Sequence, residues 1–163
     1  MMMRNMAFLA PLAVVTAIAA QAQAQAQAQE PVTITIGPRL QEEVDKLGAP
    51  EVNQQVDELR SRVAAALAER YPGATAELVL TDLKPNRPTR EQLLKTPGLD
   101  PIRSISIGGA SIEGSIVTAD GERRPVRHSY FTSNLRDVYG YGVWWDAHRA
   151  FERLADGIRS GRY

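Results

Sequence analysis

Four side chains in this sequence could carry acid–base or metal-binding chemistry: His128, His148, Asp146 and Glu113. Imidazole and carboxylate groups serve as general acids and bases, and they are common zinc ligands. The two histidines lack the close spacing of a zinc-binding helix, so a small hydrolase or a metal-assisted enzyme would require the fold to bring all four groups together. The alternative interpretation is structural, with each histidine at the core or its rim and held by a hydrogen bond.

Spacing along the chain gives little support to an active site at these residues. Asp146 and His148 are two positions apart, and side chains at that spacing point away from each other on a helix. We expect Asp146 on the solvent side of a helix near its start, where free backbone amides favour a carboxylate.

Ser111 lies in Gly109-Ala110-Ser111-Ile112-Glu113, which lacks the last glycine of a G-x-S-x-G elbow. No glycine-rich phosphate loop is present either, so we expect no cofactor and no metal, and we favour a protein that is not an enzyme.

Aromatic residues are concentrated in the last third of the chain. Seven of the ten lie within 22 positions: Tyr130, Phe131, Tyr139, Tyr141, Trp144, Trp145 and Phe151. Tyr139, Tyr141 and Trp145 lie in or beside a glycine-spaced loop, where large rings are available to contact a protein, a glycan or a lipid surface. Together with Arg136 and Arg127 they form the binding surface that the sequence predicts. The alternative is that these rings fold back and cover the end of the core.

Composition limits the classes of protein to which the chain can belong. Its 163 residues include 19 Lys or Arg, 19 Asp or Glu and no cysteine. Without cysteine we expect no disulfide scaffold, no thiolate nucleophile, no cysteine-ligated zinc and no lipid anchor attached through an N-terminal cysteine. The balanced charge provides no overall attraction to nucleic acid, so we expect no nucleic-acid partner. The length suits one domain with its own core.

The N-terminus has the pattern of a bacterial secretory signal peptide. Arg4 is the only charged residue before Ala7–Ala20, a largely apolar run that is too short to span a bilayer. An alternating Gln/Ala tract, Gln21–Gln29, follows and contains small-x-small cleavage sites such as Ala26-Gln27-Ala28. We expect residues 1–28 to be cleaved during export to the periplasm. Residues 29–163 would then form the mature domain, with no membrane-spanning segment.

Hydrophobic periodicity predicts the elements that position these residues. The predicted order is strand, helix, strand, connector, two hairpin strands and helix, with the bounds Val32–Ile36, Val52–Arg70, Ala74–Asp82, 83–101, Arg103–Thr118, Arg123–Thr132 and Trp144–Ser160. The second strand contains a break in its alternation. Four prolines make the connector irregular, and Thr89 can cap a short helix over Thr89–Leu94. This order predicts an α+β fold, in which a small, mostly antiparallel sheet of about four strands carries two main helices on one face.

The hairpin register can be predicted from burial. Ala119-Asp120-Gly121 is expected to form the loop, with Gly121 in the left-handed conformation and Thr118 paired with Glu122. One face then carries two polar pairs, Glu113 with Arg127 and Ser111 with Ser129. The other face carries Ala110, Ile112, Gly114 and Ile116 beside Tyr130, His128, Val126 and Arg124. A polar face and a mostly apolar face emerge together, which supports this register over a one-residue slip.

Part of the chain resembles a known class of protein. Ala110-Ser111-Ile112-Glu113-Gly114 leads into Ala119-Asp120-Gly121-Glu122, and Trp145-Asp146-Ala147 opens the terminal helix. These motifs, over about Ile102 to Ile158, resemble small bacterial periplasmic or lipoprotein α+β domains of unknown function. The resemblance implies a location in the cell envelope and no established activity. Members of this class often carry a lipid-bearing cysteine, which this sequence lacks.

These patterns predict an exported protein of the bacterial envelope that acts as a non-catalytic periplasmic binding or interaction domain. The loop from Asn134 to Trp145 and the adjoining Arg-rich edge of the hairpin would contact an envelope protein or a glycan. The alternative function is a small periplasmic hydrolase or metal-assisted enzyme that uses the two histidines with Asp146 and Glu113. A third possibility is a purely structural subunit of the envelope.

Overall fold

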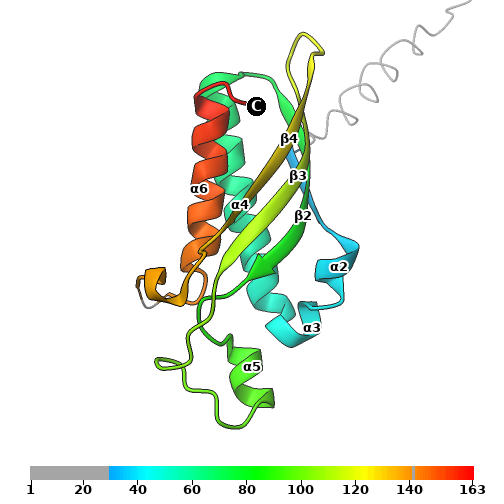
Figure 1. The fold of residues 1–163 in the computed structure, drawn as a ribbon. Helices are drawn as coiled ribbons and strands as arrows, with labels where there is room; N and C mark the ends of the chain where they lie inside the picture. The colour runs from blue at the N-terminus through cyan, green and yellow to red at the C-terminus, as the bar shows by residue number, and fades with distance from the viewer. Residues whose placement is uncertain (1–29, 141) are drawn as a thin grey trace, which may run out of the picture. The chain divides into compact units, whose positions relative to one another are not determined.

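Four strands, five α-helices and one 3-10 helix follow one another in the computed structural model, which describes residues 30–140 and 142–163 (Figure 1). Their bounds are β1 (Val32–Ile36), α2 (Pro38–Gln41), α3 (Val44–Leu47), α4 (Ala49–Arg70), β2 (Thr75–Lys84), α5 (Arg90–Lys95), β3 (Gly109–Val117), β4 (Arg123–Phe131), η1 (Leu135–Asp137) and α6 (Trp145–Arg159). The predicted signal peptide, residues 1–28, lies outside the described residues. Within the described part of the chain, none of the helices combines the length and the hydropathy that a membrane span needs.

The sheet is mixed, and the chain connections explain why. Its strand order is β1-β2-β3-β4. β1 pairs with β2 in the parallel sense, whereas β2 with β3 and β3 with β4 are antiparallel. The connection from β1 to β2 runs through α4, a long crossover that returns the chain in the same direction, whereas a short loop reverses it between β3 and β4. The predicted α+β class and the mostly antiparallel sheet are therefore confirmed, with one parallel pair at the edge.

The two long helices, α4 and α6, pack against each other and against one face of the sheet (Figure 1). Both helices bury an apolar stripe that includes Leu59, Val63, Phe151 and Leu154. Ile112 of β3 and Val126 of β4 are buried on the covered face of the sheet. The opposite face carries polar residues, as the alternation along each strand requires. The prediction of two main helices on one face is confirmed.

The hairpin register agrees with the prediction at every pair. Glu113 lies opposite Arg127, and Ser111 lies opposite Ser129. The Thr118 amide donates to the Glu122 carbonyl at 3.0 Å, and Gly121 has a φ of +87°. The register could be predicted because the loop residues and the burial pattern both require the same pairing.

The connector differs most from the prediction. β2 extends to Lys84 with an irregularity between Leu80 and Asp82, where its alternation breaks. β3 begins at Gly109 and not at Arg103, so residues 103–108 continue the irregular connector. The reason is that the Ser106 amide donates to the Asn86 carbonyl at 2.9 Å and not to a neighbouring strand. The predicted short helix is present as α5.

Thr89 begins α5 with a capping box. Its hydroxyl accepts from the Gln92 amide at 3.2 Å, and the Gln92 side chain accepts from the Thr89 amide at 3.0 Å. These two hydrogen bonds satisfy donors that the first turn of a helix leaves free. A six-residue helix in a proline-rich segment is thereby given a defined start.

Candidate functional site

The two histidines lie apart in the fold, and each has its own partner. His128 Nδ1 on β4 is 3.2 Å from the Tyr163 hydroxyl. His148 Nε2 on α6 is 2.9 Å from Oε1 of Gln55 on α4. Both rings are half-buried, and both contacts fit a histidine at the rim of the core. Each histidine therefore has the hydrogen-bond partner that the structural interpretation requires.

The carboxylates of the proposed catalytic group are also separated. Glu113 lies on the open face of the sheet, with its Oε1 3.7 Å from Nε of Arg127, whereas Asp146 is fully buried. Within residues 30–140 and 142–163, no group of three or more His, Cys, Asp or Glu side chains is placed to hold a metal ion. The structure thus does not bring the four candidate residues into one metal-binding cluster.

The helical pattern predicted Asp146 on the solvent side of α6. This prediction is wrong, since the exposed fraction of Asp146 is 0%. Its Oδ2 accepts from Asn86 Nδ2 at 2.6 Å and from the Thr132 hydroxyl at 2.7 Å. Its backbone amide donates to Asn86 Oδ1 at 2.8 Å. The carboxylate lies in the first turn of α6, where the helix dipole favours it. Helical periodicity missed this burial because Asn86 and Thr132, which lie outside α6, cover the polar side of its first turn at Asp146.

Asn86 and Arg87 connect the residues after β2, the later part of the connector and the loop before α6. The backbone amide of Asn86 donates to the Val143 carbonyl at 2.7 Å, which joins the connector to the loop before α6. Arg87 is also buried, and its guanidinium donates to the carbonyls of Ile102 and Gly140. We call Asn86, Arg87, Thr132 and Asp146 the polar hub. Because buried polar groups are stable only when hydrogen-bonded, the hub fixes the loops around it.

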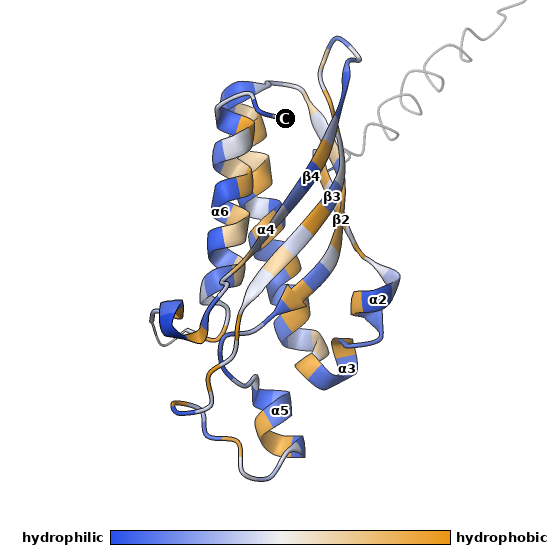
Figure 2. Ribbon diagram, viewed as in Figure 1, coloured by the Kyte–Doolittle hydropathy of each residue, from blue (hydrophilic) through white to orange (hydrophobic). Residues whose placement is uncertain are grey.

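Apolar side chains gather on the surface of those loops. Among the described residues, eight large hydrophobic side chains are exposed: Leu94, Leu99, Ile102, Ile105, Ile107, Leu135, Tyr139 and Trp145. All belong to residues 94–107 or 135–145. Figure 2 shows apolar residues along α5 and the connector that follows, at the opposite end of the sheet from the hairpin turn. We call this surface the apolar end.

The predicted binding residues fall into two groups. Tyr139 and Trp145 belong to the apolar end, with exposed fractions of 65% and 45%, and Arg136, three positions before Tyr139, is also exposed. Arg127 is exposed on the open face of the sheet, within β4 and beside Glu113, and not on the loop. Tyr141 lies outside the described residues. Tyr139, Trp145 and Arg136 are thus exposed on the same segment, residues 135–145, whereas Arg127 lies in a strand.

Sequence reasoning missed the contribution of the connector to this surface. Leu94 and Ile102 have exposed fractions of 73% and 63%, and three more aliphatic residues accompany them. Ile105 and Ile107 alternate with serines, which favoured a strand. One sequence feature could have indicated this surface. Large aliphatic residues lie beside prolines there, in a segment that cannot be buried as a regular helix or strand.

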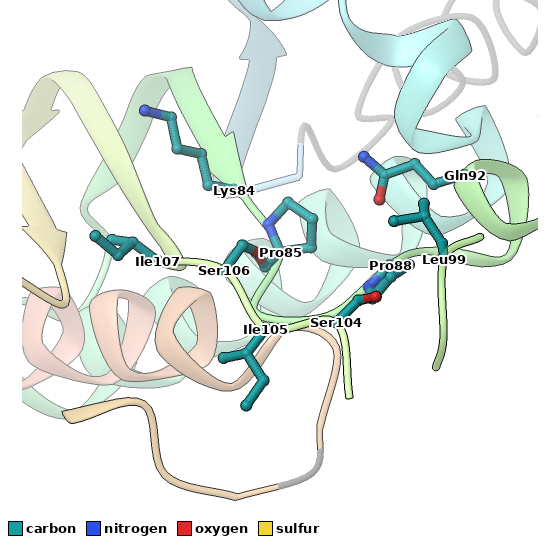
Figure 3. A pocket seen from close by; sticks show the side chains of 9 residues that line it. All are labelled: Lys84, Pro85, Pro88, Gln92, Leu99, Ser104, Ile105, Ser106 and Ile107. Atoms are coloured by element: carbon teal, nitrogen blue, oxygen red, sulfur yellow. The ribbon is translucent and has the colours of Figure 1, made fainter. Parts of the chain in front are cut away.

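A cavity of about 320 Å³ opens within the apolar end (Figure 3). Its lining comes from the end of β2, from α5 and from the connector: Lys84, Pro85, Pro88, Gln92, Leu99, Ser104, Ile105, Ser106 and Ile107. Proline and aliphatic side chains supply most of this lining, and Lys84 supplies a cation. A recess of this kind can receive an apolar group whose polar or anionic part stays near the surface.

Burial gives the two histidines a predictable effect on stability. Desolvation lowers the pKa of both His128 and His148. The folded protein therefore binds fewer protons than the unfolded chain as the pH falls from about 6.5 toward those lower pKa values, and stability decreases over that window.

We expect the free energy of unfolding to decrease between about pH 7.5 and pH 5.5, and we expect a His128→Gln/His148→Gln variant to lose much of that decrease. Urea denaturation across this range, followed by circular dichroism, measures both slopes. Equal slopes for the two proteins would show that the buried rings do not control the acid sensitivity.

No family model, curated protein or solved structure matches this chain. The resemblance of the hairpin motifs to periplasmic domains therefore stays a prediction from sequence. The geometry of the apolar end and the polar hub is the remaining basis on which a function can be inferred.

Proposed function

We propose that this protein is a non-catalytic binding domain of the bacterial envelope and that it contacts its partner through the apolar end. The observation that carries the proposal is the gathering of all eight exposed large hydrophobic side chains of the described residues in two segments. Scattered apolar residues are normal on a protein surface, whereas a contiguous patch marks an interaction site.

The polar hub supports this role because it holds the two segments in place. Arg87 reaches both the connector, at Ile102, and the loop before α6, at Gly140. Glu51 adds a further link, since it accepts from the Arg90 amide at 2.8 Å and from Trp144 Nε1 at 3.1 Å. A binding surface whose loops are already fixed loses less conformational entropy when it binds.

The proposed location follows from the N-terminal sequence. Residues 1–28 have the pattern of a cleaved bacterial signal peptide, and export would place the domain in the periplasm. A partner in the envelope would then be a protein, a glycan or a lipid surface.

The absence of cysteine from the chain allows a direct test of whether the apolar end is covered in cells. Ile102→Cys introduces a single thiol at an exposed position of the apolar end, and Thr33→Cys introduces one on the open face of the sheet. We expect a maleimide to label the first variant about tenfold more slowly in intact cells than after purification, because a bound partner excludes the reagent.

The control variant should be labelled at similar rates in both preparations, once the rates are corrected for access of the reagent to the periplasm. Equal cellular protection at the two positions, or no protection at either, would contradict the proposal. Labelling followed by mass spectrometry measures both rates.

A further inference from the structure

We infer that the partner of the apolar end is the surface of an anionic phospholipid bilayer. This inference rests on the proposed function and names the chemistry of the partner. Three observations carry it: the types of side chain that are exposed, the charge around them, and their position at one end of the sheet.

The exposed side chains are of the types that enter the boundary between lipid headgroups and acyl chains. Six are leucine or isoleucine, and the other two are Tyr139 and Trp145. Aliphatic side chains gain free energy when they leave water for acyl chains, and the amphipathic rings of tyrosine and tryptophan favour the headgroup level. Because the cavity beside Lys84 has mostly apolar walls, it can also receive part of an acyl chain.

The apolar end is basic although the whole chain is balanced. Residues 94–107 and 135–145 contain three Lys or Arg and two Asp or Glu, and with the flanking residues 84–93 and 132–134 the counts are six and three. The exposed basic residues among them are Lys84, Arg90, Lys95, Arg103 and Arg136. This surface therefore has the charge that attracts anionic headgroups.

Two of the three acidic residues are already engaged within the protein. Glu91 Oε1 is 2.8 Å from Lys95 Nζ. Asp100 accepts hydrogen bonds from the amides of Arg103 and Ile102, which lower the pKa of its carboxyl and keep it as the acceptor of that turn. Of the three, only Asp137 is exposed, whereas Glu91 and Asp100 are partly buried. Lys95 is itself the partner of Glu91, and Lys84 Nζ lies 3.8 Å from Asp82 Oδ2, so the basic character of this surface rests mainly on Arg90, Arg103 and Arg136.

The position of the apolar end also suits a bilayer. Figure 1 shows α5, the connector and η1 at the end of the sheet opposite the hairpin turn. Side chains on several loop tips at one end can enter a single plane together, and acyl chains adapt to their uneven outline. The open face of the sheet lacks these features, since its polar residues pair with one another, as in Glu113 with Arg127 and Ser111 with Ser129.

Trp145 provides a reporter for the test. Residues 1–29 contain no tryptophan, and Trp144 is buried, so a change in emission on lipid binding will come chiefly from Trp145. The full chain is titrated with vesicles of phosphatidylglycerol and, separately, of phosphatidylcholine. We expect a shift to shorter wavelength with phosphatidylglycerol, a much weaker effect with phosphatidylcholine, and a loss of binding as NaCl is raised from about 50 to about 500 mM. Trp145→Phe should abolish the shift.

A charge-matched pair of variants identifies the surface. Arg103→Glu/Arg136→Glu should lower the apparent affinity for phosphatidylglycerol vesicles at least about tenfold, whereas Arg123→Glu/Arg127→Glu, at exposed positions of β4, should change it little. Equal effects of the two pairs, equal shifts with the two lipids, or no shift would overturn the inference. If the Ile102→Cys thiol is protected in cells while vesicles fail to bind, the proposed function stands and the partner is a protein or a glycan.

Discussion

Replacing Asp146 with alanine is expected to lower the free energy of unfolding by about 3 kcal/mol. The substitution removes the acceptor of two hydrogen bonds, at 2.6 and 2.7 Å. The side-chain Nδ2 of Asn86 and the hydroxyl of Thr132 then lose this acceptor while they stay buried. A donor that is buried without an acceptor loses its hydration and gains nothing in return. Urea denaturation followed by circular dichroism measures the loss.

Asp146→Asn is the matched control. Its side-chain oxygen can still accept from both donors, and its amide would replace Oδ1, which accepts no hydrogen bond among the described residues. We expect this variant to lose about 1 kcal/mol or less, since it gives up mainly the favourable charge at the start of α6 and the 3.9 Å contact of Oδ1 with the half-exposed Arg149. Similar losses for the alanine and asparagine variants would mean that the charge, and not the hydrogen bonding, stabilises the hub.

The same pair of variants tests whether the hub holds the apolar end. Asp146 positions Asn86, and the Asn86 carbonyl accepts from the Ser106 amide at 2.9 Å. Asp146→Ala should therefore increase hydrogen exchange at Ser106 more than at residues in the middle of β3, because local opening affects the connector first. Asp146→Asn should leave the exchange at Ser106 close to that of the unchanged protein.

The hairpin shows what sequence alone could establish in this chain. Its loop, its register and its two faces were predicted because all of them depend on residues close together in sequence. Gly121 supplies the left-handed conformation, and the Glu113–Arg127 pair appears once that loop is set. Local conformational preference and burial led to the same pairing.

The polar hub could not be predicted in the same way. Asn86 and Asp146 are 60 positions apart, and no periodic pattern connects a connector residue with the first turn of a helix. A helical wheel places Asp146 on the polar side because it averages over the whole of α6. Tertiary contacts at the helix start override that average, and only the folded arrangement reveals them.

The members of the apolar end were identified from sequence only in part. The sequence indicates the rings of Tyr139 and Trp145 because they lie in or beside a glycine-spaced loop, whereas its patterns place the aliphatic residues of the connector in a strand or give them no role. Nearness in sequence groups Arg127 with those rings, but in the structure it lies on the open face of the sheet. Distance along the chain was thus a poor guide to which charges accompany the exposed rings.

Gly114→Ala is expected to destabilise the protein by about 3 kcal/mol or more. Gly114 lies between Leu78 of β2 and Val126 of β4, with a φ of +147°. A Cβ at this position would lie 2.1 Å from the Glu77 carbonyl oxygen, so β2 and β3 would have to separate or shift. The glycine in this Ile-Glu-Gly stretch is therefore explained by close approach of backbones and requires no binding or catalytic role. Denaturant unfolding and the strand signal in circular dichroism measure the effect.

Gly121→Ala separates crowding from backbone strain. Gly121 also has a positive φ, of +87°, but a Cβ there would meet no atom within 4 Å. Strain alone should cost about 1 kcal/mol at this exposed turn. If both substitutions lowered stability equally, the close contact with Glu77 would not be the cause, and the tight pairing of β2 with β3 at Gly114 would have to be reconsidered. A much larger loss at Gly114 would show that the middle of the sheet tolerates no side chain where the I-E-G motif places its glycine.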